Sequence, residues 1–223
     1  MLATQMLASS ESVAERLSHC VRRLGDGAWL AHVPAFVDGA WIDPLRAEQP
    51  LRQVSLVICG RQIATPRLTS WHGDPGAHYR YSGRTFEPAP WTPTLARVRD
   101  CLADALGVRF DAVLANWYRD GNDAMGWHSD DEPELGPDAP DDVLVASVSL
   151  GVQRRFLLQP KAKQGARVEL VLGGGDLLVM GGSTQRRWRH SVPRERAIAA
   201  PRLNLTFRLL RRAAAAASGS RSA

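Results

Sequence analysis

Cysteine is scarce in this sequence, whose 223 residues contain only Cys20, Cys59 and Cys101. The three lie far apart, and no two of them form a Cys-x-x-Cys pair. This number and spacing indicate neither a disulfide framework nor a zinc ribbon. We therefore expect a protein of a reducing compartment, the cytoplasm.

Long apolar runs are also lacking. Nowhere does the sequence reach the roughly 18 consecutive apolar residues of a membrane-spanning helix. Residues 1–12 contain no basic segment followed by an apolar stretch, which a secretion signal would require. We therefore expect neither secretion nor a membrane partner.

Positive charge, by contrast, is in excess. Lysine and arginine number 28 against 23 aspartate and glutamate residues, which gives a formal net charge of +5. This balance favours a polyanionic partner without identifying one, because a soluble basic protein with no such partner has the same balance.

The length fits one compact domain with a sizeable core. We expect residues 1–30 to form a partly helical extension, because apolar residues have a weak helical spacing from Ser12 to Leu24. Residues 31–212 should form the domain. Residues 213–223 have nothing large to bury and should fray. A monomer is expected.

The clearest helix signal runs from Thr92 to Leu106. Thr92 can cap the helix, Pro93 suits its first turn, and Gly107 can end it. Its apolar face should pack on a sheet and consists of Leu95, Val98, Leu102 and Leu106.

From Val113 onward the pattern changes to short strand-like runs separated by turn residues. This spacing predicts a mainly β fold with flanking helices, built as an antiparallel barrel or jelly roll. The glycines at 173–175 lack the Lys-Ser/Thr of a phosphate loop and open an apolar run, so they predict a turn. The expected strands are Val113–Tyr118, Val143–Leu150, Arg155–Gln159, Val168–Leu172, Leu177–Met180 and Leu203–Leu209.

Three residues are candidate metal ligands. His128 and Asp130 are two positions apart, so on an extended backbone their side chains leave the same face. With the distant His190 they could form two imidazoles and one carboxylate on one side of an ion, the facial triad of non-haem Fe(II) oxygen chemistry. Each residue alone could equally be an ordinary polar group.

The last expected strand alternates strictly between polar and apolar residues. Its apolar residues point one way, and its polar residues, Arg202, Asn204, Thr206 and Arg208, point the other. A polar face could simply be solvated, but buried arginines would need an anionic partner, and guanidinium binds carboxylate in a bidentate fork. Asn116 and Tyr118 form a second such pair on an earlier strand.

Taken together, these motifs resemble the AlkB-type Fe(II)/2-oxoglutarate dioxygenases, which dealkylate nucleobases. The motifs are Asn-x-Tyr, His-x-Asp-Asp-Glu, a distal His and Arg-x-Asn-x-Thr-x-Arg, and the resemblance covers roughly residues 50 to 211. It implies a double-stranded β-helix, or jelly-roll, core with a nucleotide-recognition lid at about residues 50–90. It also implies Fe(II), 2-oxoglutarate and O2 as cofactor and co-substrates.

By this resemblance, His128, Asp130 and His190 hold Fe(II) rather than Zn(II). The distal carboxylate of 2-oxoglutarate should be held by Arg202 with help from Thr206, while Arg208 serves the metal-proximal carboxylate or Asp130. The remaining co-substrate contacts should come from Asn116, Tyr118 and Asn204.

The resemblance places substrate contacts at the rim. Tyr79 and Tyr81 match a Tyr-x-Phe-Ser-Gly segment, in which the second aromatic residue stacks on the extruded base against His128. Asp131 and Glu132 match acidic positions that face the base, although a solvated turn is the alternative.

By the same resemblance, a loop fills the gap that the flipped base leaves and acts as a wedge. This loop consists here of Ile58, Cys59, Gly60 and Arg61. Cys59 stands where duplex-repairing relatives have an aromatic residue, which puts a preference for duplex DNA in doubt.

Arginines flank His190, and Arg187 and Arg189 are expected to contact phosphates at the mouth of the site, unless this is a surface loop without a partner. The resemblance thus implies oxidative dealkylation of N-alkylated bases, of the 1-methyladenine or 3-methylcytosine type, in DNA, with RNA left open. One alternative is the same iron chemistry on a protein or small molecule. The other is a non-catalytic nucleic-acid-binding module.

Overall fold

The computed structural model of the protein describes residues 11–58, 61–81, 84–132, 135, 143–162 and 165–210. Side chains are described for these residues except 56–58, 61, 79–81 and 84–86. The predicted wedge at Cys59 and Gly60 and the tail at 213–223 lie outside them, as do the side chains of Ile58, Arg61, Tyr79 and Tyr81.

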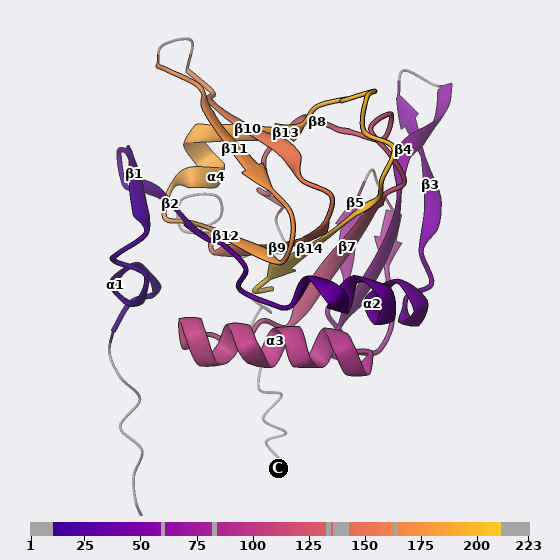
Figure 1. Cartoon of the computed structure of the whole chain (residues 1–223), viewed down its shortest axis with the longest axis horizontal. Helices are drawn as coiled ribbons and strands as arrows, with labels where there is room; N and C mark the ends of the chain where they lie inside the picture. Colours follow the sequence, from indigo (N-terminus) through magenta and orange to yellow (C-terminus); the bar gives the residue numbers. More distant parts are fainter. Residues whose placement is uncertain are drawn as a thin grey trace, which may run out of the picture.

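Two antiparallel sheets form the body of the protein (Figure 1). The larger has the order β1-β2-β12-β9-β14-β7-β4-β3, and the smaller has the order β11-β10-β13-β8. The strands of the larger sheet are β1 (Val21–Gly25), β2 (Ala28–Val33), β3 (Arg52–Ile58), β4 (Arg61–Gly73), β7 (Ala112–Tyr118), β9 (Val145–Gly151), β12 (Asp176–Gly181) and β14 (Arg202–Arg208). Those of the smaller sheet are β8 (Met125–His128), β10 (Arg154–Pro160), β11 (Val168–Leu172) and β13 (Trp188–Val192).

A separate hairpin and several helices complete the fold. The hairpin pairs β5 (Tyr79–Tyr81) with β6 (Arg84–Phe86), and the helices are α1 (Val13–Arg16), the 3-10 turn η1 (Gly39–Trp41), α2 (Ile42–Glu48), α3 (Pro93–Leu106) and α4 (Thr184–Arg187). The predicted mainly β, jelly-roll architecture with flanking helices is confirmed. No helix in the described part of the chain is long and apolar enough to cross a membrane.

Helix α3 forms where the sequence predicts it. The Thr92 hydroxyl accepts a hydrogen bond from the Leu95 N–H, and Gly107, at φ 69°, ends the helix by donating its N–H to the Ala103 carbonyl. Its apolar side chains are fully buried against the larger sheet, where they join one core cluster with Leu203, Leu205 and Phe207 of β14. In Figure 1, α2 and α3 cover this face of the sheet.

Strand β14 is the centre of the larger sheet, between β9 and β7. Because its apolar side chains fill the core beneath α3, its polar side chains must face the space between the two sheets. The sheets meet there in a second apolar cluster that includes Phe156, Leu158 and Met180. The fold thus places the polar row of β14 inside the protein.

The N-terminal segment differs from the expectation. Only part of the stretch from Ser12 to Leu24 is helical, because α1 ends at Arg16 and β1 begins at Val21. Strand β2 pairs with β12, so the β1–β2 hairpin belongs to the larger sheet. The expected boundary after residue 30 falls within β2.

The glycines at 173–175 form the turn between β11 and β12. Their backbone N–H groups donate to the Asp176 carboxylate, the Gly151 carbonyl and the Ser149 carbonyl, respectively. A phosphate loop needs such N–H groups for its ligand, so the prediction of a turn is confirmed.

This turn allows a test of stability with two neighbouring glycines. A β-carbon on Gly175, at φ 99°, would collide with the Val37 carbonyl, whereas one on Gly174, at φ 61°, would meet open space. Gly175→Ala should therefore lower the free energy of unfolding by more than about 3 kcal/mol, because a collision adds to backbone strain of about 1–3 kcal/mol. Gly174→Ala should cost only about 1–2 kcal/mol. Urea denaturation measures both, and equal losses would contradict the turn geometry.

Candidate metal centre

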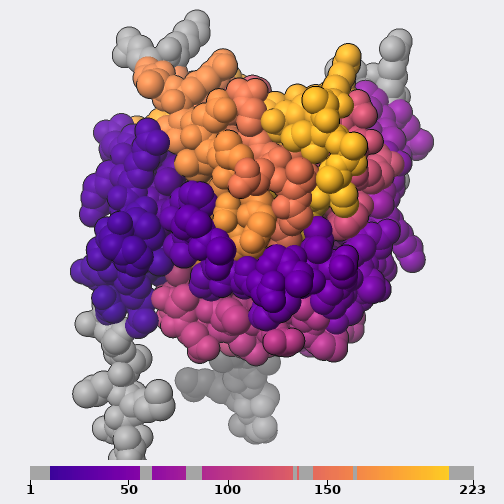
Figure 2. All heavy atoms as spheres, viewed as in Figure 1, coloured from indigo at the N-terminus to yellow at the C-terminus, as the bar shows by residue number. Residues whose placement is uncertain are grey.

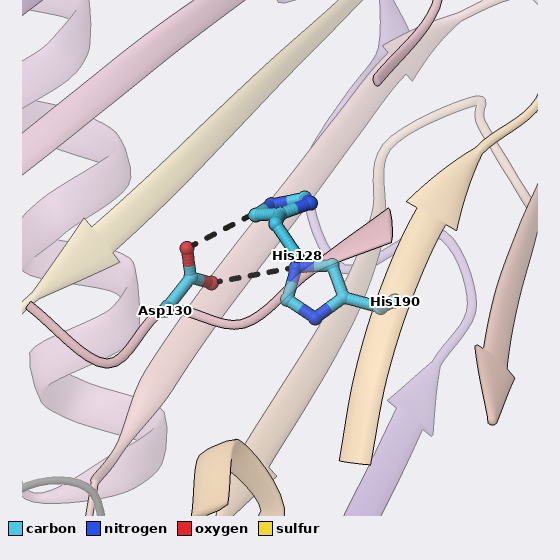
Figure 3. A group of neighbouring side chains, drawn as sticks. All are labelled: His128, Asp130 and His190. Atoms are coloured by element: carbon cyan, nitrogen blue, oxygen red, sulfur yellow. Dashed lines mark ion pairs between the residues drawn. The ribbon is translucent and has the colours of Figure 1, made fainter. Parts of the chain in front are cut away.

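His128, Asp130 and His190 come together between the sheets (Figure 3). His128 on β8 and His190 on β13 are register partners, and their ring centroids are 4.2 Å apart. Asp130 follows β8, and its Oδ1 lies 4.0 Å from His128 Nε2 while its Oδ2 lies 3.6 Å from His190 Nε2. One ligand atom from each residue lies within 4.8 Å of the others. The three side chains therefore face one point that a metal ion could occupy.

The Asp130 carboxylate is buried and held ionised. Burial disfavours its charge, but the neighbouring positive charge, above all that of Arg208, outweighs burial and lowers the pKa of Asp130 to about 2. Arg208 Nη2 donates to Asp130 Oδ1 at 2.6 Å. The Asp130 backbone N–H donates to the side-chain oxygen of Gln185 on α4 at 2.9 Å. Both contacts fix the carboxylate as an anionic ligand.

The imidazoles are held in a form that binds metal. His128 Nδ1 lies 2.9 Å from the Gly126 carbonyl oxygen, which can only accept, so Nδ1 donates its proton there and Nε2 is left as the acceptor. Burial, and then the neighbouring His128, lower the pKa of His190 to about 3. His190 is therefore neutral near pH 7, as an imidazole ligand must be.

A cavity of about 360 Å³ opens beside these ligands. The larger sheet supplies Asn116 and Tyr118 from β7 and Asn204, Thr206 and Arg208 from β14, all of them predicted co-substrate residues. The other walls come from β3 and β4 of the same sheet and from the smaller sheet, and they include Arg52, Thr65, Arg67, Trp71, Met125, Phe156 and Val192. The cavity is thus polar on one wall and mixed on the others.

Arg202 lies next to this cavity and is only 1% exposed. Its Nη2 donates to Ser149 Oγ at 2.7 Å, and its guanidinium carbon lies 5.4 Å from the ring of Tyr118, which lines the cavity. Its Nε and Nη1 are buried and have no hydrogen-bond partner among the described residues. Burial lowers the pKa of Arg202, yet a guanidinium remains charged at neutral pH. Two unpartnered donors on a buried cation fit a carboxylate ligand.

The other polar residues of the wall are held by hydrogen bonds in two groups. Asn204 Nδ2 donates to Ser147 Oγ at 2.7 Å, and the Thr206 hydroxyl donates to Asn204 Oδ1 at 3.2 Å. Arg67 Nε donates to Asn116 Oδ1 at 2.7 Å. These contacts fix the side-chain directions before any ligand binds.

Arg208 takes the second of its two predicted partners, Asp130, and its Nη1 also donates to Glu132 Oε1 at 2.8 Å. Glu132 lines the cavity. Asp131 instead has a side chain that is 43% exposed and lies 3.2 Å from Lys161 Nζ. The prediction that Asp131 faces the substrate base therefore rests on the resemblance alone.

The two predicted phosphate contacts do not line the cavity. Arg187 Nη1 lies 3.2 Å from Asp26 Oδ2, on the side of the β1–β2 hairpin. Arg189, on β13, has its guanidinium carbon 5.6 Å from the ring of Trp127. Because Arg189 neighbours the inward-facing His190 in the strand, it points away from the metal site.

Several site residues escaped the sequence analysis. Ser147 and Ser149 alternate on β9 with buried apolar residues, a period-two signal that was available in the sequence. Gln185 and Arg67 had no such signal, because only the fold places them against Asp130 and Asn116.

Comparison with known proteins places the chain in a family. The model of the 2OG-Fe(II) oxygenase superfamily matches residues 36–208. The chain belongs to this superfamily. The family's description names Fe(II) and 2-oxoglutarate, and the triad of His128, Asp130 and His190 offers the metal a place.

Curated relatives include the DNA oxidative demethylase ALKBH2 of Mus musculus, 42% identical over 158 residues, which are 68% of this chain and 64% of that protein. The human ALKBH2 is also 42% identical over 158 residues, with 68% and 59% covered. The human alpha-ketoglutarate-dependent dioxygenase alkB homolog 3 is 38% identical over 188 residues, with 78% and 64% covered. The resemblance to the AlkB-type family is thereby confirmed, although the chain spans less than two thirds of each relative.

The fold has a counterpart among solved structures. The structure of OsALKBH1 superposes with a TM-score of 0.58 at 19% identity, covering 85% of this chain and 99% of the other. At this identity, the match concerns the architecture alone. It supports the jelly-roll core that the two sheets form.

Proposed function

We propose that this protein is an Fe(II)- and 2-oxoglutarate-dependent dioxygenase that removes alkyl groups from ring nitrogens of bases in DNA, with RNA left open. The observation that carries the proposal is that the protein has both the triad and Arg202, a buried cation that has two unpartnered donors. The relatives named as DNA oxidative demethylases support the choice of substrate.

In this proposal, His128, Asp130 and His190 hold the metal. Bound Fe(II), 2-oxoglutarate and O2 would supply the oxidation of an N-alkyl carbon, with succinate, CO2 and an aldehyde as products. Arg202 would bind the distal carboxylate of 2-oxoglutarate through its charge and its unpartnered donors, Nε and Nη1. Arg208 would keep Asp130 ionised and oriented.

The cavity walls would exclude water and orient the base. Trp71 and Phe156 supply apolar surface in the cavity, while Arg67 is held by Asn116. Asn116, Tyr118, Asn204 and Thr206 would contact the co-substrate from the wall that they form. Localisation in the cytoplasm and a monomeric state remain predictions from the sequence.

A stacking test checks the choice of a base as substrate. By the family resemblance, Tyr81 stacks on the flipped base, a contact of about 1–3 kcal/mol, so Tyr81→Ala should lower kcat/KM for a methylated oligonucleotide roughly ten- to a hundredfold. Tyr81→Phe keeps the aromatic ring and should retain most of the kcat/KM of the unmutated protein. Uncoupled consumption of 2-oxoglutarate should survive in both variants.

Other outcomes of these assays favour other functions. If Tyr81→Ala leaves turnover of methylated bases untouched, the stacking role is wrong. If the unmutated protein oxidises a peptide or metabolite and no methylated base, the same iron chemistry on a protein or small molecule becomes the better reading. Nucleic-acid binding without any turnover of 2-oxoglutarate would indicate a non-catalytic binding module.

A further inference from the structure

A second, larger groove lies apart from the cavity of the metal site. Its volume is about 560 Å³, and it runs between the β1–β2 hairpin, helix α4 and the facing ends of β10 and β11. In Figure 2, the N-terminal segment (indigo) lies along one side of the molecule, next to the β10–β11 segment (orange). Elements distant in sequence thus form its walls.

The groove is strongly cationic. One carboxylate, that of Asp26, is among its lining residues, against six cationic side chains, which gives a formal charge of +5. This local excess equals the net charge of the whole chain, so the remainder of the protein is close to neutral. The six cationic side chains are Arg22, Arg23, Lys161, Arg167, Arg186 and Arg187.

Several of these cations are available to a ligand. Arg187 is paired with Asp26 at 3.2 Å, but both side chains are largely exposed, so this pair contributes little and can open. Arg22 and Arg23 are exposed and form no ion pair or side-chain hydrogen bond with any described residue. Arg167 lies over the Trp127 ring at 5.7 Å, a contact that leaves its donors at the surface.

One wall of the groove is joined to the metal site. Lys161 lines the groove, and its Nζ lies 3.2 Å from the carboxylate of Asp131 and donates to the Gln185 carbonyl at 2.8 Å. Asp131 follows the metal ligand Asp130, and the Gln185 side chain accepts from the Asp130 N–H. A polyanion in the groove therefore passes within a few residues of the metal ligands.

We propose that this groove holds the phosphodiester backbone of the nucleic-acid strand that carries the alkylated base, some nucleotides beyond that base. The inference rests on the proposed function. A nucleic-acid strand supplies regularly spaced anions, and arginine forks on three elements suit such a row better than a single small anion. The cavity would then read the base, and the groove would supply affinity that does not depend on sequence.

The test compares strand lengths. The double variant Arg22→Ala/Arg23→Ala should bind a long methylated single strand roughly tenfold more weakly at low salt, and the log–log salt slope should flatten by about 1 to 1.5, because two phosphate contacts are lost. Binding of a methylated nucleoside monophosphate, which has no further nucleotides to occupy the groove, should not change. Fluorescence anisotropy over a salt series measures both.

A matched control removes the same charge elsewhere. Arg46 on α2 and Arg97 on α3 are exposed and lie over Trp117 and Trp41, on the helical side of the larger sheet. Arg46→Ala/Arg97→Ala should leave the salt slope for the long strand unchanged. If this variant weakens long-strand binding as much as the groove variant does, or if the groove variant binds like the unmutated protein, the groove proposal is overturned.

The two proposals can fail separately. Length-dependent binding that needs Arg22 and Arg23, with no turnover of methylated bases, would keep the groove and reject the proposed function. Turnover of methylated bases, with no effect of the groove variant on binding of long strands, would keep the proposed function and reject the groove.

Discussion

Replacing Asp130 with alanine is expected to abolish iron binding and turnover. Asp130 is the single anionic member of the triad, and it is 3% exposed. Changes to residues that only support metal ligands already cost about 10–100-fold in affinity, so loss of the ligand itself should cost more than about a hundredfold. Iron stoichiometry after dialysis and succinate release measure the two effects.

The same substitution removes a partner of Arg208. Breaking a buried ion pair costs about 3–5 kcal/mol, although Glu132 remains bonded to Arg208 and should reduce this loss. Circular dichroism and thermal unfolding must therefore accompany the metal measurement. Asp131→Ala is the matched control, because this neighbouring carboxylate is exposed and pairs with Lys161. Full iron occupancy in folded Asp130→Ala would rule out the triad as the metal site.

Replacing Arg202 with alanine is expected to raise the 2-oxoglutarate requirement far more than the oligonucleotide requirement. The change removes charge-assisted hydrogen bonds from the co-substrate alone, and hydrogen bonds to charged groups contribute about 1.5–3 kcal/mol each. The apparent KM for 2-oxoglutarate should therefore rise at least roughly tenfold, while the KM for the oligonucleotide should stay nearly constant.

A conservative variant separates binding from a structural role of Arg202. Arg202→Lys keeps the charge near Ser149 and Tyr118 but cannot form the planar fork, so its KM for 2-oxoglutarate should lie between those of the unmutated and alanine proteins. Direct calorimetric titration of 2-oxoglutarate into the metal-loaded protein should give the same ranking. An unchanged affinity in Arg202→Ala would remove this residue from the co-substrate site.

The sequence was most informative where local signals agreed with tertiary packing. Helix α3 carries a cap, a first-turn proline, an apolar face and a terminal glycine, and the structure uses all of them. In contrast, the apolar spacing from Ser12 to Leu24 was a single weak signal. There, the turn at Gly25, Asp26 and Gly27 and the pairing of β1 with β2 outweigh the helical spacing.

The site residues likewise fall into those that local sequence signals indicate and those that only the fold brings together. The spacing of His128 and Asp130 and the alternation of β14 are local, so the sequence could indicate both. The contacts of Gln185 with Asp130 and of Arg67 with Asn116 join segments that only the fold brings together. For the same reason, the charge run around His190 could not reveal that Arg187 lies in a groove with Arg22 and Arg23.

The most direct measurement is product release from a single-stranded oligonucleotide that carries one 1-methyladenine or 3-methylcytosine, with Fe(II) and 2-oxoglutarate supplied. We predict formaldehyde and succinate in equal amounts, together with the unmodified base, and neither formaldehyde nor base repair in Asp130→Ala. Succinate release that is independent of the methylated base, with the modified base left intact, would contradict the account.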